Sequence, residues 1–233
     1  MNIGFIIVVR TDSKRLKNKT LINIYKNKKL IDLVIKNILK IFPKNYKLIV
    51  ATTNRIVDQN LIRYIKNNYK NIEIFKGNYL NVALRFLNTM KRFDLNYAIR
   101  VNGDSPLIDM SLIKKNLKFL EKTKYDIITN VYKRSYPKGQ SVEIISRDIL
   151  IKYIKNISKS RKHSEHITSY FYKDNIFKKL RSRQIKNKKD FSKINLSIDN
   201  QRDLEFLKSI VKKKNKTDLK KLVILRKEFD QND

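Results

Sequence analysis

The 233-residue chain has no cysteine and only four glycines and three prolines. The absence of cysteine excludes disulfides, thiolate metal sites and a cysteine nucleophile. The few glycines form neither GxGxxG nor GxxxxGK[ST], so the phosphate cradle of dinucleotide-binding and P-loop proteins is missing. No apolar run approaches the roughly 20 residues of a membrane helix, and no charged leader with a cleavage site precedes the first apolar stretch. We therefore expect a cytoplasmic protein with no membrane partner.

Acidic residues are scarce beside basic ones: 21 Asp and Glu stand against 54 Lys and Arg, which gives a net charge of +33. A balance this basic is typical of proteins that bind nucleic acid or an anionic membrane. The lysines, however, are spread through the whole chain together with many Asn and Ile, which indicates a codon-level bias towards A and T. We therefore do not expect nucleic acid as a partner, although a basic nucleic-acid-binding protein remains the alternative of a different class.

The first half of the chain alternates between strand and helix patterns. Short apolar runs rich in β-branched residues predict strands at 3–9, 46–53, 71–75 and 96–101, and apolar residues at helical spacing predict helices at 30–42, 58–68, 80–93 and around 112–122. This alternation predicts an α/β fold with a mostly parallel, Rossmann-like sheet that carries helices on both faces.

The second half is less regular. Its patterns predict strands at 125–130, 141–146 and 193–199 and helices at 148–157, 161–172 and 201–211, followed by a charged, solvent-facing helix over 212–229. The irregular stretch 131–183 is predicted to form a small appended lobe for substrate binding and dimerisation. No Gly/Ser-rich or Pro-rich linker divides the chain, so residues 1–233 are expected to form a single domain.

Polar residues gather where the predicted strands end. Ligands of open α/β sheets bind beyond the carboxyl ends of the strands, so these residues are the candidates for a site. The first strand runs into a basic loop that holds Arg10, Ser13, Lys14, Arg15, Lys17 and Lys19, and later strands end at Thr52 and Thr53, at residues 102–105 and at Asp199. The basic loop suits a polyanion such as a triphosphate, and a solvated surface loop is the alternative.

Asp104 and Asp199 are the candidate metal ligands. Asp104 lies in NGDSP, where Gly103 permits a tight turn and Pro106 ends the strand. A carboxylate in such a position suits Mg²⁺, which takes oxygen ligands from carboxylates and substrate phosphates. The alternatives are structural: an Asx turn or a helix cap for Asp104, and the N-cap of the next helix for either Asp199 or Asn200.

The chain has two histidines, His163 and His166, which lie three residues apart and so share one face of the predicted helix. A zinc pair needs further ligands, and without cysteine only carboxylates remain, so we do not expect a zinc site. A polar contact to substrate or to a partner subunit is the favoured interpretation, and an exposed helix face is the alternative.

Several segments, in order, resemble one family. IIVVRTDSKRLKNKTL is similar to the signature of the nucleotide-sugar cytidylyltransferases, the family of the CMP-sialic acid and CMP-KDO synthetases, and especially to its SpsF-type polysaccharide-biosynthesis branch. The residues that match this signature are Arg10, Ser13, Arg15, Leu16 and Lys19, whereas Asp12 stands where the family has glycine. The resemblance continues in VATT, FKGNYLNVALRF, RVNGDSPLID, PKGQSVEIIS, SEHITSYFY and LSIDNQRDLEFL, with Ser141 in place of the usual Asp, and extends from Ile3 to about Ile210.

The resemblance implies a GT-A-type fold and an Mg²⁺-assisted reaction in which CTP and an acidic sugar give a CMP-sugar and pyrophosphate. It implies that the catalytic residues are Arg10, Arg15 and Lys19, on the triphosphate, and Asp104, which holds the metal with Asp199. The further candidates for substrate binding are Ser13, Asn102, Gln140, Glu143 and His166.

Two wider expectations follow from the same resemblance. Related synthetases are commonly dimers, so we expect a homodimer that uses the region 131–172. Because a fold does not determine its function, another nucleotidyltransferase or a glycosyltransferase on the same scaffold is the alternative enzyme.

Overall fold

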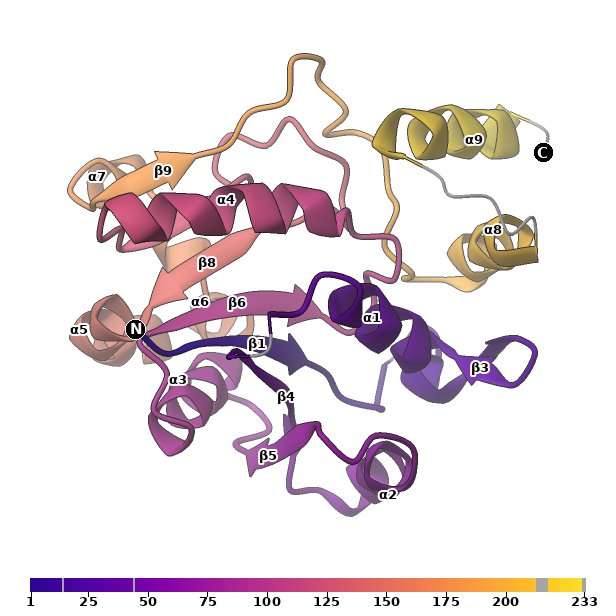
Figure 1. Cartoon of the computed structure of the whole chain (residues 1–233), viewed down its shortest axis with the longest axis horizontal. Helices are drawn as coiled ribbons and strands as arrows, with labels where there is room; N and C mark the ends of the chain where they lie inside the picture. The colour runs from indigo at the N-terminus through magenta and orange to yellow at the C-terminus, as the bar shows by residue number, and fades with distance from the viewer. Residues whose placement is uncertain (14, 44, 213–217, 232–233) are drawn as a thin grey trace.

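The computed structural model describes residues 1–13, 15–43, 45–212 and 218–231, so Lys14 of the basic loop and residues 213–217 of the predicted tail helix lie outside the described residues. In the described part of the chain, a seven-stranded sheet runs in the order β5-β4-β1-β6-β8-β7-β9 (Figure 1). Its strands are β1 (Ile3–Val8), β4 (Lys47–Thr53), β5 (Glu73–Gly77), β6 (Tyr97–Asn102), β7 (Ile127–Thr129), β8 (Glu143–Ser146) and β9 (Ser182–Gln184). A second sheet is a two-stranded ribbon of β2 (Asn23–Tyr25) and β3 (Lys28–Lys29).

The large sheet is mostly parallel, as predicted. β1 pairs in parallel with β4 on one side and with β6 on the other, so that Ile6 lies between Ile49 and Arg100. β5 extends the parallel part beyond β4, whereas β8 is antiparallel to both β6 and β7. The parallel strands β1, β4 and β6 therefore end at the same edge of the sheet, where the basic loop begins.

Helices cover both faces of the sheet, which confirms the α/β prediction. In β1, Phe5 and Ile7 belong to one buried cluster, together with α1 (Leu30–Leu39), α2 (Gln59–Asn68) and α4 (Met110–Lys122). Ile6, between them, belongs to the opposite cluster, together with α3 (Val82–Arg92) and α5 (Arg147–Ser158). Successive strand residues point to opposite faces and both faces are buried, which is why this strand is a continuous apolar run in the sequence. None of the described helices is long and apolar enough to cross a membrane.

The segment 131–183, predicted as an appended lobe, is built onto this same sheet. Its strand β8 lies inside the sheet between β6 and β7. Its helices α5 and α6 (Arg161–Glu165) both contact α3, and the short helix α7 (Asp174–Phe177) follows them (Figure 1). The chain reverses direction to insert β8 beside β6, so the segment shares the core of the main sheet and does not stand apart from it.

The prediction of one helix over residues 161–172 is wrong. α6 ends at Glu165, His166 has a non-helical backbone, and a 3₁₀ turn, η3, covers Ser169–Tyr172. Phe171 is fully buried in the core between the sheet and α5.

The prediction of a strand over residues 193–199 is also wrong. The Leu196 N–H donates to the Lys138 carbonyl, and the Ile198 N–H donates to the Asp104 carbonyl, each at 2.9 Å. Two loops thus satisfy the backbone of this apolar segment where a neighbouring strand was expected. The segment runs across the carboxyl edge of the sheet and brings Asp199 towards β6.

The tail helix was predicted to be solvated, and for one side of it this is wrong. In the described residues it forms α9 (Leu219–Gln231), which packs against α8 (Gln201–Lys212). Leu222 is buried next to Phe206, and the buried Arg226 pairs with Asp203 at 2.9 Å. The charged residues of this helix masked the apolar periodicity that would have indicated a buried face.

Gly139 is the glycine on which the shape of this edge depends. Its φ is +85°, and an added Cβ would lie 2.6 Å from the backbone of both Leu196 and Ser197. A left-handed conformation costs an ordinary residue about 1–2 kcal/mol, and the clash with backbone adds to that. We therefore expect Gly139→Ala to lower the free energy of unfolding by more than about 2 kcal/mol. Urea denaturation should show this loss, while Lys138→Ala, an exposed neighbour, should leave stability unchanged; equal stability of both variants would contradict the argument.

Candidate functional site

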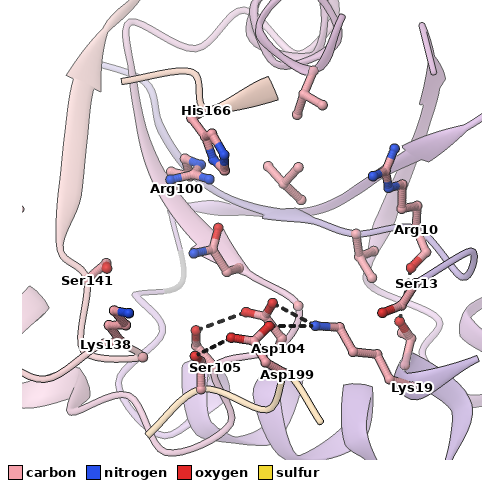
Figure 2. A pocket seen from close by; sticks show the side chains of 18 of the residues that line it. Arg10, Ser13, Lys19, Arg100, Asp104, Ser105, Lys138, Ser141, His166 and Asp199 are labelled. Atoms are coloured by element: carbon pink, nitrogen blue, oxygen red, sulfur yellow. Dashed lines mark hydrogen bonds and ion pairs between the residues drawn. The ribbon is translucent and has the colours of Figure 1, made fainter. Parts of the chain in front are cut away.

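A cavity of about 600 Å³ opens at the carboxyl edge of the parallel strands (Figure 2). Its lining brings together eight of the predicted site residues: Arg10, Ser13, Arg15, Lys19, Asn102, Asp104, His166 and Asp199. β1 leads directly into the basic loop, and β6 ends at Asn102. Because the two strands are parallel neighbours, the loop and Asn102 lie at the same edge of the sheet. The strand-end rule therefore located the loop and strand-end part of this lining from the sequence.

A buried carboxylate shapes the start of the basic loop. Asp58 is 1% exposed and accepts hydrogen bonds from the N–H and the hydroxyl of Thr11, both at 2.8 Å, and from the hydroxyl of Thr53 at the end of β4. Asn18 adopts a left-handed backbone (φ 52°) immediately before Lys19, a conformation that asparagine tolerates. Asp58 thus ties the start of the loop to the end of β4, and cations of the loop line the cavity.

Lys19 lies between the two carboxylates that were predicted to hold metal. Its Nζ is 2.9 Å from Asp104 Oδ2 and 3.5 Å from Asp199 Oδ1, and it donates to the Ile198 carbonyl at 2.9 Å. Arg15 Nη2 reaches the same oxygen of Asp199 at 3.1 Å. The Lys19 side chain is 14% exposed and that of Arg15 is 71% exposed, so solvent screens the contacts of Lys19 far less.

Neither of these carboxylates caps a helix. Asn200 Oδ1 accepts from the Asp203 N–H at 2.9 Å, which makes Asn200 the N-cap of α8, and Asp109 is the N-cap of α4. Asp104 and Asp199 thus offer oxygen atoms at one wall of the cavity, a donor set that fits Mg²⁺. Within residues 1–13, 15–43, 45–212 and 218–231, no group of three or more His, Cys, Asp and Glu side chains is placed to hold a metal ion. Further ligands would therefore come from substrate phosphates and water.

Asp12, which replaces a family glycine, is paired with two arginines. Its carboxylate lies 3.3 Å from Arg10 Nε and accepts a hydrogen bond from Arg55 Nη1. The Arg55 guanidinium in turn stacks on the ring of Tyr79, 4.1 Å from its centroid. Burial raises the pKa of Asp12, but hydrogen bonds from Tyr79 and Arg55 outweigh this and hold the pKa below its usual value. The added negative charge is thus neutralised beside the loop, and Arg10 is drawn towards Asp12 and, at 3.3 Å, towards Glu165.

Four further cations line the cavity and were not predicted: Arg85, Arg100, Arg134 and Lys138. Arg85 is 1% exposed, and burial, helped by the charge of Arg10, lowers its pKa to about 10, so it remains charged at neutral pH. An arginine inside the apolar patterns VALRF and NYAIRV was the signal available for Arg85 and Arg100. Arg134 and Lys138 lie in the loop before β8, where no periodicity distinguishes one position from another.

Gln140 was predicted to bind substrate, but the structure places it away from the cavity lining. Its side chain is fully buried: Oε1 accepts from the Asp109 N–H at 2.8 Å, and Nε2 donates to the Leu107 carbonyl at 2.6 Å. Both polar groups are used to hold the loop that leads into α4. Glu143 is also absent from this lining; it lies behind Arg100, with which it forms an ion pair.

The two histidines do not share a helix face, because α6 ends before His166. The ring of His163 bonds to the Ser169 hydroxyl at 2.8 Å and lies edge-on to Tyr170. His166 lines the cavity and lies close to Arg100 in Figure 2. Of the pair, only His166 is therefore placed for a contact with substrate.

A mostly parallel sheet with a cationic cavity and two carboxylates at its carboxyl edge is the arrangement of an α/β nucleotidyltransferase. The chain matches the family described as Cytidylyltransferase over residues 4–228. It belongs to the cytidylyltransferase family and is thus a CTP-dependent nucleotidyltransferase, which confirms the resemblance that its motifs indicated.

Three known proteins illustrate the similarity. The spore coat polysaccharide biosynthesis protein SpsF of Bacillus subtilis (strain 168) is 24% identical over 218 residues, which cover 91% of this chain and 87% of SpsF. A cytidylyltransferase structure from Leptospira borgpetersenii has a TM-score of 0.83 at 24% identity and covers 100% of this chain and 95% of its own. The structure of CMP:2-keto-3-deoxy-manno-octonic acid synthetase, complexed with CTP, has a TM-score of 0.65 at 15% identity and covers 92% and 100% of the two chains. At these identities the two structures show a shared fold.

Proposed function

We propose that the enzyme transfers the cytidylyl group of CTP to the anomeric hydroxyl of an acidic sugar, of the nonulosonate or KDO type, and releases pyrophosphate. The product, a CMP-sugar, would serve surface polysaccharide biosynthesis. The observation that carries the proposal is the convergence of the loop cations Arg15 and Lys19 with the carboxylates of Asp104 and Asp199 at one cavity. The family and the similarity to SpsF and to a synthetase that binds CTP support it.

The chemistry that this arrangement suits is an in-line displacement at the α-phosphorus. The anomeric oxygen forms a bond to the α-phosphorus, the bond from the α-phosphorus to the bridging oxygen breaks, and pyrophosphate leaves, with the hydroxyl proton passing to solvent. No covalent intermediate with the protein is required, so the residues act by positioning and charge neutralisation. In this proposal Arg10, Arg15 and Lys19 bind the triphosphate oxygens, and Asn102 and Ser13, which line the same cavity, contact the substrate. Asp104 and Asp199 would hold Mg²⁺, which polarises phosphoryl oxygens when it is bound.

The test is a matrix of nucleotides and acceptors. The protein is incubated with Mg²⁺, one of the four nucleoside triphosphates, and either KDO or N-acetylneuraminic acid, and products are read by pyrophosphate release and mass spectrometry. We expect pyrophosphate and a CMP-sugar with CTP only. Turnover of a sugar phosphate with another nucleoside triphosphate, or of a nucleotide-sugar donor, would contradict the proposal and support another nucleotidyltransferase or a glycosyltransferase.

We also propose that the enzyme is a homodimer that uses the region 131–172. Tyr153, His163 and Tyr170 form an aromatic group in this region, with the Tyr153 and Tyr170 ring centroids 5.6 Å apart. Aromatic residues with polar tips are common at subunit interfaces. Multi-angle light scattering at micromolar concentration should give twice the mass of the chain, and a monomer would contradict the proposal.

A further inference from the structure

The wall of the cavity opposite the basic loop continues into a second, smaller space of about 270 Å³. Both spaces share a set of lining residues: Arg100, Asn102, Arg134, Ser141 and His166. In Figure 2, Arg100, His166 and Ser141 lie across the cavity from Arg10 and Ser13 of the loop. The site thus has cations at two ends, and only one end contains the loop assigned to the triphosphate.

Arg100 offers hydrogen-bond donors that nothing else uses. It lies on β6, its side chain is 13% exposed, and Nη1 pairs with Glu143. Its buried Nε has no hydrogen-bond partner among the described residues. Buried donors are nearly always satisfied in proteins, so this guanidinium has hydrogen-bonding capacity that the described residues leave unused. The Arg100 side chain also lines both spaces.

Arg134 supplies the second cation of this wall. Nη1 donates to the Pro137 carbonyl and Nη2 to the Ser141 hydroxyl, both at 3.2 Å. Within the part of the chain that the structure describes, no carboxylate lies within ion-pair distance of it. Burial lowers its pKa, although the charge of Glu143 acts in the opposite direction. A partly buried guanidinium bound only to neutral oxygens favours an anion beside it.

Glu143 holds Arg100 in place from behind. It lies on β8, next to β6, and is 2% exposed. One carboxylate oxygen accepts from the hydroxyls of Thr168 and Tyr172, the latter at 2.7 Å, and the other accepts from Arg100. Burial raises the pKa of Glu143, yet Arg100 and these hydroxyls outweigh that and hold the pKa below its usual value. The carboxylate is therefore ionised, and both of its oxygens already accept hydrogen bonds. Glu143 also lines the smaller space, but its contacts suit a support for Arg100 better than a ligand for the sugar.

We propose that Arg100 and Arg134 form the subsite for the anionic group of the acceptor sugar, and that Glu143 is the positioning residue that aims Arg100 at it. This inference rests on the proposed function, which identifies the anion as a carboxylate. A phosphate presents the same chemistry to two guanidinium groups, so the experiment contains an arm for each anion.

The variants are Arg134→Met, Arg134→Lys and Glu143→Gln, with Asp94→Asn as the control. Asp94 pairs with Arg147 at 2.8 Å and precedes β6 at the end remote from the cavity. Each protein is assayed with CTP and four acceptors: KDO, N-acetylneuraminic acid, glucose 1-phosphate and the neutral N-acetylmannosamine. Isothermal titration of the same acceptors in the presence of CMP measures their affinity for the subsite without turnover.

We expect Arg134→Met and Glu143→Gln to raise the KM of the anionic acceptor about tenfold or more, while the KM of CTP changes less than twofold. Arg134→Lys should recover part of the loss, and Asp94→Asn should match wild type. If Glu143→Gln does not fold, Arg134→Met by itself tests the subsite, because Arg134 lines the cavity and is not part of the core.

The outcomes separate the two proposals. An unchanged acceptor KM in Arg134→Met, or a neutral sugar used as well as an acid, overturns the subsite. Use of glucose 1-phosphate in place of the acids, weakened by Arg134→Met, keeps the subsite and overturns the acidic-sugar function. If wild type turns over no acceptor, titration decides: acceptor binding that Arg134→Met abolishes keeps the subsite, and no binding at all overturns both.

Discussion

Replacing Asp104 or Asp199 by Asn is expected to lower turnover by about two orders of magnitude or more while leaving Tm nearly unchanged. Asn keeps the shape of the side chain and loses its charge, and a carboxylate ligand of Mg²⁺ contributes through that charge. Metal polarisation stabilises such transition states by several kcal/mol, and about 1.4 kcal/mol corresponds to tenfold in rate. Tm should hold because α8 and α4 are capped by Asn200 and Asp109.

Asp203→Asn is the contrasting variant for this experiment. Asp203 is 1% exposed, pairs with the buried Arg226, and accepts from the N–H groups of Asp199 and Asn200. Removing one partner of a buried pair costs about 3–5 kcal/mol, so here Tm should fall. Turnover is measured against Mg²⁺ concentration, together with the affinity for CTP with and without Mg²⁺. Full Mg²⁺-dependent activity in Asp199→Asn would show that Asp199 holds no metal.

Lys19→Ala is expected to weaken CTP binding more than Arg15→Ala does. A charge-assisted hydrogen bond contributes about 1.5–3 kcal/mol, or about 10- to 150-fold in affinity. Lys19 is mostly buried between Asp104 and Asp199, whereas Arg15 is largely exposed, so the loss should lie near the upper end for Lys19 and near the lower end for Arg15. Lys19→Ala also removes the cation that pairs with Asp104, whereas Asp199 keeps its contact with Arg15.

Isothermal titration with CTP and Mg²⁺ measures this difference. Lys17→Ala is the matched control, because Lys17 lies in the same loop, carries the same charge, is exposed and does not line the cavity. We expect its affinity for CTP to equal that of wild type within about twofold, since an exposed charge pair contributes little. If Lys19→Ala and Arg15→Ala behave like Lys17→Ala, the loop is only a basic surface.

The features that could be predicted from sequence are those with a local cause. β1 is a continuous apolar run because Phe5 and Ile6 face two different buried layers, and the loop after it is basic over a few consecutive residues. Parallel strands end at a common edge, so the positions of Lys19 and Asp104 after their strands were enough to expect them close together. Where the cause was not local, as for the segment 193–199, the apolar pattern suggested a sheet strand and the backbone in fact pairs with loops.

The amino-acid sequence was therefore sufficient for the α/β class, the family and the loop residues that line one side of the cavity. Only the tertiary structure showed that the buried Gln140 side chain holds the loop before α4. It also showed that Glu143 pairs with Arg100 and that Arg134 lines the same cavity. The physical reason is that periodicity reports which face of an element is buried, whereas the partner of a buried polar group depends on segments distant in the chain. Here the partners were set by the reversal that inserts β8 beside β6.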